Sequence, residues 1–312
     1  MTQRVGPLAA GRAATLLAAT ALVAAPTAAP QQPTFRSGTS GVYVDVSVMD
    51  GRRPVRDLTA ADFAVFDNDV RQTVDEAIVD AGDLDVSVII DLSGSVGRPF
   101  ASVVAASLAE VADLIRPTDR LDLIGVDHQV RRITSAPIEP NRGRNGVLAI
   151  RDGGTALFDA VAATLMKPIE PGRRHLILAI TDGLDTLSTI PRDTRLRIVA
   201  RSNAVVHLIG ISLAGRTLGF TRVGFGAEEH DVAGNYDYLL EEIAEGSSGR
   251  FYDLRPDQPL GDTLREAVEQ FRARYLLRYI PRGVDSGGWH ELRVEVPGRR
   301  YQVHARKGYF AR

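Results

Sequence analysis

The chain has 312 residues, of which 44% are hydrophobic and 24% charged, a composition typical of a soluble globular protein with one sizeable core and room for a smaller module. The formal net charge of -2 excludes the strongly basic character of a nucleic-acid-binding protein. The absence of cysteine excludes disulfides, thiolate zinc sites and cysteine nucleophiles.

The first residues have the layout of an export signal. Arg4 and Arg12 precede an apolar, alanine-rich run over 13–25, and small residues follow at 26–30. This pattern predicts a secretory signal peptide over 1–29 and a linker over 30–41. The apolar run is shorter than the roughly 20 residues that span a bilayer. We therefore expect cleavage and a secreted or periplasmic chain without a membrane span, with an uncleaved N-terminal anchor as the alternative.

Short strand patterns stand at both ends of the remaining chain. Residues 42–48 alternate apolar and polar side chains, the period of a half-buried strand. A segment as small as 42–82 cannot bury a stable core alone, so it should pack against another part of the chain. We expect it to form a small antiparallel β module with residues 274–312. The strand patterns are 42–48, 64–66, 73–79, 275–279, 291–296 and 301–304.

Between these ends, residues 83–273 alternate apolar strands with helical stretches, which is typical of an α/β domain. The strands are apolar on both faces, as in a sheet covered on both sides. The prediction is a doubly wound, mostly parallel sheet with helices on both faces. The expected strands are 86–90, 121–126, 175–180 and 205–211, and the expected helices are 102–115, 156–166, 193–201, 236–245 and 260–274.

Oxygen-bearing side chains gather where these strands should end. Asp91, Ser93 and Ser95 follow the first central strand, Asp182 follows the strand over 175–180, and Thr155 precedes a helix. Ligands of open α/β sheets bind at the carboxyl ends of the strands. Either serine alone could cap a helix, but the joint occurrence at three element ends favours a metal site.

The types of donor indicate which metal such a site would take. Hard oxygens without histidine or cysteine favour Mg²⁺, Mn²⁺ or Ca²⁺ over zinc or copper. Mg²⁺ fits best, because it keeps several waters and needs few protein ligands. The six histidines are scattered without metal-binding spacing, and His175 and His207 are expected to be ordinary strand residues.

An Asp-x-Ser-x-Ser run after the first strand, a distant threonine and a later Thr-Asp-Gly resemble the von Willebrand factor A fold and its metal-ion-dependent adhesion site. The resemblance covers about 83–271. It implies that Ser93, Ser95 and Thr155 contact the metal, that Asp91 and Asp182 bind directly or through water, and that an acidic group of a partner completes the coordination. The flanking strands resemble those of longer bacterial proteins related to von Willebrand factor A.

Three functions follow as hypotheses. The first is an exported, metal-dependent module, not an enzyme, that binds a carboxylate of a protein partner. The second is a structural or assembly factor of the cell envelope with a non-essential metal site. The third is a metal-dependent hydrolase with Asp91 or Ser93 as nucleophile, which is disfavoured because phosphotransfer folds place a second aspartate where Ser93 stands. The glycine-rich stretch 215–235 is expected to shape the rim of the site, and Asp185 to be a solvated loop residue.

Overall fold

The computed structural model describes residues 41–96, 98–134, 153–211, 240–254 and 258–311. The expected signal peptide, the linker up to residue 40 and the stretch 215–235 lie outside these ranges. No helix in the described ranges is long and apolar enough to cross a membrane.

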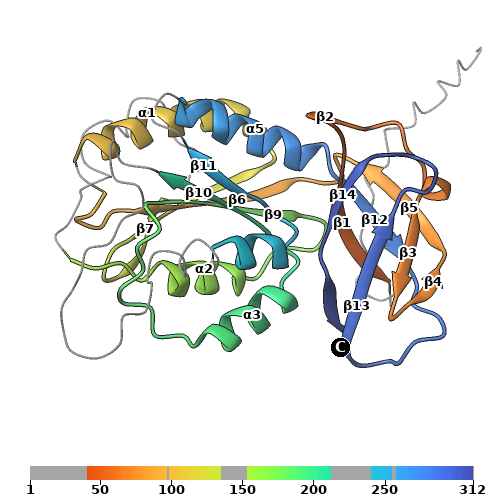
Figure 1. Ribbon diagram of the computed structural model, residues 1–312. Coiled ribbons are helices and arrows are strands. Elements are labelled where there is room, and N and C mark those ends of the chain that lie inside the picture. The colour runs from red at the N-terminus through yellow and green to blue at the C-terminus, as the bar shows by residue number, and fades with distance from the viewer. Residues whose placement is uncertain (1–40, 97, 135–152, 212–239, 255–257, 312) are drawn as a thin grey trace, which may run out of the picture. The chain divides into compact units, whose positions relative to one another are not determined.

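The central sheet has six strands in the order β11-β10-β9-β6-β7-β8 (Figure 1). Four of the five strand pairings are parallel, and the edge strand β8 runs antiparallel to β7. The α/β class is confirmed, and the sheet is mixed because a short hairpin adds β8 at its edge. The strands are β6 (Leu84–Asp91), β7 (Arg120–Val126), β8 (Val130–Thr134), β9 (Arg174–Thr181), β10 (Val205–Ile211) and β11 (Phe251–Leu254).

Helices cover both faces of this sheet (Figure 1). Strand β6 is buried along its whole length, and alternate residues such as Val88 and Ile89 enter different cores. α1 (Arg98–Leu114) and α5 (Leu260–Arg272) cover the Val88 face, whereas α2 (Leu157–Leu165), α3 (Arg192–Arg201) and helical residues 240–246 cover the Ile89 face. α5 buries residues at helical spacing, including Leu264, Val268 and Phe271, which makes it amphipathic.

The flanking strands form two antiparallel sheets around a third apolar core. One has the order β14-β1-β12-β5 with β2 beside β1, and the other has the order β15-β13-β3-β4. β1 pairs with β12 and β14, so strands from both ends of the described chain share one sheet. The elements are β1 (Val42–Asp50), β2 (Arg53–Pro54), the 3₁₀ turn η1 (Ala60–Asp62), β3 (Ala64–Asp67), β4 (Val70–Gln72), β5 (Val74–Val79), β12 (Tyr275–Tyr279), β13 (Gly288–Glu295), β14 (Gln302–Ala305) and β15 (Gly308–Ala311).

One buried aspartate ties these two sheets together. Asp67 of β3 is fully buried, and its Oδ2 accepts hydrogen bonds from the hydroxyls of Tyr279 (2.7 Å) and Tyr309 (2.9 Å). Its Oδ1 lies 2.6 Å from His290 Nδ1. Since a buried carboxylate is costly without partners, this network supplies the polar contacts that the core of the module needs.

A second polar cluster joins the β module to the central domain. Asp45 of β1 pairs with Arg174, the first residue of β9, and lies 3.9 Å from Nε of Arg274, just after α5. Arg274 also donates to the Asp45 carbonyl (3.1 Å) and to the Ser248 hydroxyl (2.7 Å). The carboxylate and both guanidiniums are almost entirely buried. These contacts fasten β1 to the amino-terminal end of the central sheet.

Candidate metal site

The carboxyl ends of β6 and β9 bring the site residues together. The two strands are parallel neighbours, with Ile90 paired to Ile180, so Asp91 and Thr181 end side by side. The Thr181 hydroxyl donates to Asp91 Oδ2 over 2.8 Å. This bond fixes one oxygen of the aspartate and leaves Oδ1 facing the loop that follows β6.

The Asp91-Leu92-Ser93-Gly94-Ser95 loop folds back on the aspartate. Asp91 Oδ1 accepts hydrogen bonds from the Ser93 backbone N–H (3.0 Å) and hydroxyl (2.6 Å). The Ser93 hydroxyl in turn lies 3.0 Å from that of Ser95. The Thr155 hydroxyl reaches the same Asp91 oxygen from α2's amino-terminal side, at 3.5 Å. The four side chains therefore present a connected set of oxygens at one edge of the sheet.

Asp182 adds a second carboxylate to this edge. Its Oδ1 accepts the Leu184 N–H over 3.1 Å. Burial raises the pKa of Asp91 to about 6, and the nearby charge of Asp182 contributes to the rise, against the hydrogen bonds from Ser93 and Thr181. Asp91 is inaccessible to solvent and Asp182 is 6% exposed. Two buried carboxylates that repel each other make a place where a cation is favoured.

Thr155 is positioned by close contact with the loop after β9. Its N–H donates to the Thr186 hydroxyl (3.1 Å), and its carbonyl accepts the N–H groups of Thr186 (3.0 Å) and Leu187 (2.9 Å). A Cβ on Gly154 would lie 2.2 Å from the Thr186 hydroxyl oxygen, so only glycine permits this approach. Gly183 has a φ of +85°, which turns the chain directly after Asp182.

The expectation that Asp185 is a solvated residue is wrong. Asp185 is 7% exposed and accepts the backbone N–H groups of Phe158 (3.3 Å) and Ser188 (3.1 Å), with Arg195 at 3.8 Å. Because Phe158 lies in the first turn of α2, this carboxylate joins the loop after Asp182 to the helix after Thr155. Asp185 thus fixes the loop that follows Asp182 against α2.

Sequence reasoning also missed Thr181 and Thr186, whose hydroxyls orient Asp91 and Thr155. A threonine as the last residue of a buried strand was the available signal for Thr181. His175 and His207 are buried residues of β9 and β10, as expected. Burial lowers the pKa of His175 to about 4 and that of His207 to about 3, so both are neutral at pH 7.

The residues at this edge fit a divalent cation with oxygen ligands. They supply two carboxylates and several hydroxyls, the donors that suit Mg²⁺, Mn²⁺ and Ca²⁺. Within the described ranges, no group of three or more His, Cys, Asp and Glu side chains is arranged to hold a metal. An ion here would therefore depend on the hydroxyls as well as on the two carboxylates.

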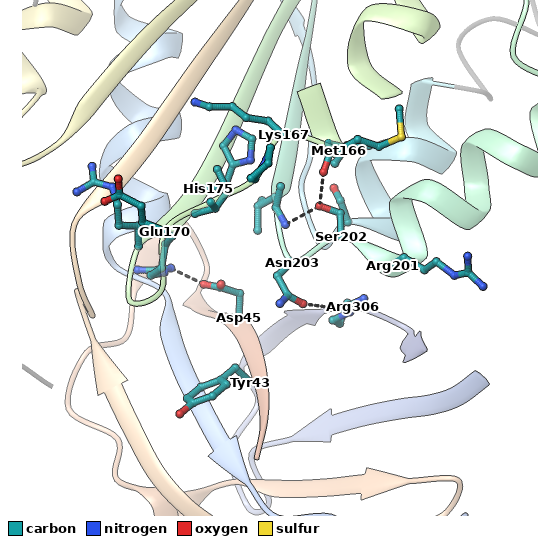
Figure 2. Close-up of a pocket in the computed structure, with 18 of the residues that line it drawn as sticks. Tyr43, Asp45, Met166, Lys167, Glu170, His175, Arg201, Ser202, Asn203 and Arg306 are labelled. Carbon is teal, nitrogen blue, oxygen red and sulfur yellow. Dashed lines mark hydrogen bonds and ion pairs between the residues drawn. The ribbon is translucent and has the colours of Figure 1, made fainter. Parts of the chain in front are cut away.

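The opposite end of the central sheet carries a cavity of about 990 Å³ (Figure 2). It lies along the contact with the β module, where Tyr43 and Asp45 face the loop containing Glu170 and the end of α3. Many of its polar side chains have partners inside or beside the cavity. Arg306, for example, donates to Asn203 Oδ1 (2.7 Å) and to the Ala200 carbonyl (2.5 Å). None of the five expected metal-site residues lines this cavity.

The protein is thus an α/β domain with a compact cluster of side-chain oxygens at the carboxyl ends of β6 and β9. No family model and no curated protein matches the sequence. Among solved structures, the fold is similar to that of von Willebrand factor A proteins. The von Willebrand factor type A protein from Catenulispora acidiphila aligns at 14% identity and a TM-score of 0.45, over 87% of this chain and 72% of its own.

Two further structures align in the same way. The ArnB paralog VWA2 from Sulfolobus acidocaldarius has 13% identity and a TM-score of 0.44, with 88% of this chain and 76% of its own covered. Proximal thread matrix protein 1 of the mussel byssus, with a zinc-occupied MIDAS motif, has 16% identity and a TM-score of 0.47 over 64% of this chain. The present chain spans about half, 48%, of that mussel protein.

Proposed function

We propose that this chain is an exported protein-binding module of the von Willebrand factor A type, and that it binds a carboxylate of a protein partner through a divalent cation. The observation that carries the proposal is the buried Asp91 carboxylate. It contacts the hydroxyls of Ser93 and Thr155, and the nearby charge of Asp182 raises its pKa. The ion would be held by Asp91, Ser93, Ser95, Thr155 and Asp182, with Mg²⁺ favoured over Mn²⁺ and Ca²⁺.

The bound cation would supply an electrophilic centre for an anionic oxygen of the partner. The charges of the protein ligands would determine its affinity for that oxygen. Neutral hydroxyls from Ser93, Ser95 and Thr155 neutralise none of the ion's charge. An aspartate that binds through water neutralises it less than one in direct contact, so the ion would keep an affinity for one more carboxylate. The same arrangement supports binding rather than nucleophilic attack by Asp91, because both of its carboxylate oxygens already accept hydrogen bonds, from Thr181 and Ser93.

Calorimetric titration of the purified chain with MgCl₂, MnCl₂ and CaCl₂ tests the metal site. We expect saturable binding of one ion, strongly weakened in Asp91→Asn and weakened in Ser95→Ala. Ser95 is only partly buried, so its truncation should leave the fold intact and keep the test decisive if Asp91→Asn folds poorly. Asp193→Asn, at an exposed carboxylate in the first turn of α3, is the matched control and should bind as wild type does.

Equal metal affinity in wild type, Asp91→Asn and Ser95→Ala would refute the proposed ligand set. No binding in wild type would favour a structural or assembly role in the envelope. The proposed export is tested separately, by expressing the whole sequence in a bacterial host and determining the N-terminus of the chain recovered outside the cytoplasm. A chain retained in the cytoplasm with its first residues intact would contradict export.

A further inference from the structure

A second cavity lies where α3 and the helical residues 240–246 meet strands β13 and β15 of the β module. Its volume is about 360 Å³, at the lower end of the range for ligand sites, so it suits one side chain better than a larger ligand. Part of its lining is apolar and includes Leu196, Val199 and Trp289. The charged part consists of Glu241, Glu242, Glu245 and Lys307.

The indole of Trp289 is held in place while much of it stays in contact with solvent. Trp289 is the only tryptophan of the chain and is 46% exposed. A Cβ on Gly308 would lie 2.2 Å from Trp289 Cζ2, so the indole lies directly against the backbone of β15. The ring of Phe310 packs edge to face with it, with 5.2 Å between the ring centroids. An aromatic surface fixed in this way loses little conformational entropy when a partner covers it.

The charged part of the lining is net negative and can accept a further cation. Arg192 Nη2 donates to both oxygens of Glu242 (2.6 and 2.7 Å). Glu245 pairs with Lys307 over 3.0 Å, through side chains that are 64% and 75% exposed. Such an exposed pair contributes little to stability, so its carboxylate can exchange partners. Glu241 is exposed and forms no ion pair with the described residues. Glu241 and Glu245 can therefore pair with a cation from outside the chain.

The two parts of the lining together suit a side chain with an apolar stem and a positive end. Arginine and lysine cover apolar surface with their methylene groups while the charged end stays among polar groups. The planar guanidinium of arginine also stacks on aromatic rings and binds carboxylates with two parallel hydrogen bonds. Tryptophan is the ring that attracts a cation most strongly. The chain already contains such a contact, because the guanidinium of Arg201 lies 4.8 Å from the centroid of Phe310, the ring that packs on Trp289.

We propose that this cavity binds an arginine side chain of a protein partner. The guanidinium lies on the indole of Trp289 and pairs with Glu241 and Glu245, and the methylene groups cover the apolar part of the lining. This binding needs no metal ion. It is a second contact surface, separate from the proposed metal site at the carboxyl ends of β6 and β9.

Titration of the full chain with acetyl-arginine-amide in the presence of EDTA tests the proposal. Tryptophan fluorescence is the readout, because the only tryptophan lines the cavity. We expect saturable binding with a dissociation constant on the order of 1 mM, as for one cation on one aromatic ring with exposed carboxylates. Acetyl-citrulline-amide has nearly the same shape without the charge and should bind at least about fivefold more weakly.

Four variants locate the binding, with NMR of the ligand as the readout that all of them share. Trp289→Leu keeps an apolar side chain but removes the aromatic face, and should weaken binding at least about fivefold. Glu241→Gln should weaken it by about twofold to fivefold. Lys307→Gln removes the competitor for Glu245 and should strengthen binding by a similar factor. Glu76→Gln, at an exposed carboxylate of β5 that does not line the cavity, is the matched control and should change nothing.

Three results would overturn the proposal. Wild type could fail to bind the arginine derivative, or it could bind the citrulline derivative equally well, which would exclude recognition of the charge. An arginine affinity unchanged in both Trp289→Leu and Glu241→Gln would place the binding on another surface. EDTA is present throughout, so none of these results depends on the proposed metal-dependent function. All four variants should keep the Mg²⁺ affinity of wild type in calorimetry, and their thermal unfolding verifies that they are folded.

Discussion

Replacement of Asp45 by asparagine tests how the β module is fastened to the central domain. The substitution keeps the shape of the side chain and removes its charge, which leaves Arg174 and Arg274 without their carboxylate. The side chains of these arginines are 5% and 4% exposed, so water replaces the carboxylate poorly. Removing one partner of a buried ion pair costs about 3 to 5 kcal/mol. Because asparagine retains one acceptor oxygen, we expect a loss near the lower end, about 3 kcal/mol.

Chemical denaturation of wild type and Asp45→Asn measures this loss as a change in the free energy of unfolding. Asp75→Asn is the matched control, since Asp75 is 34% exposed and its partner Arg278 stands 3.5 Å away. Exposed pairs contribute about 0 to 1 kcal/mol, so the control should change little. If Asp45→Asn also loses less than about 1 kcal/mol, solvent or rearranged acceptors compensate both guanidiniums, and the argument from burial is refuted.

Three further predictions concern other parts of the chain. The pKa of His175 is about 4 in the folded protein and about 6.5 in the unfolded chain, so the unfolded chain takes up the proton first. The contribution of this residue to stability is therefore unchanged well above pH 6.5 and falls by about 3 kcal/mol as the pH drops towards 4. The free energies of unfolding of wild type and His175→Gln should diverge across this range, and parallel curves would contradict the prediction. Tyr279→Phe removes a donor from the buried Asp67 and should lower the free energy of unfolding by about 1 to 3 kcal/mol in the same assay, whereas no loss would show that other donors suffice. Gly154→Ala places a Cβ 2.2 Å from a hydroxyl oxygen of the facing loop and should weaken Mg²⁺ binding in calorimetry at least tenfold, whereas Gly287→Ala, with nothing within 4 Å, should not.

The strand ends of the site could be predicted because their signals are local. An apolar run such as 175–180 identifies a buried strand without knowledge of its neighbours, and the residues after it then fall at the carboxyl edge. Asp91 and Asp182 were placed together by this rule alone. Thr155 was expected at the same site from its place before a helix and from the resemblance, and the structure places its hydroxyl 3.5 Å from Asp91 Oδ1.

The features that were not predicted depend on contacts between distant segments. β8, β11 and β15 are four or five residues long, and their sequences carry too short a pattern to distinguish a strand from a loop. The burial of Asp185 follows from its bonds to α2 and to its own loop, which no pattern around residue 185 reveals. The pairing of Asp45 with Arg174 joins residues 129 positions apart, and an Asp-Arg pair of that kind has no signature in a single sequence.

Strand β9 has a polar cluster of the central domain at each of its two ends. Its first residue, Arg174, holds Asp45 of the β module, and its last, Thr181, holds Asp91 of the candidate metal site. Eight residues of extended chain separate the clusters by about 23 Å along the strand. Residues 176–180 between them are fully buried in two apolar cores, which resist deformation. Since substitutions more than about 10 Å apart without shared partners act additively, the fastening of the β module and the affinity for metal should be independent properties of one rigid strand.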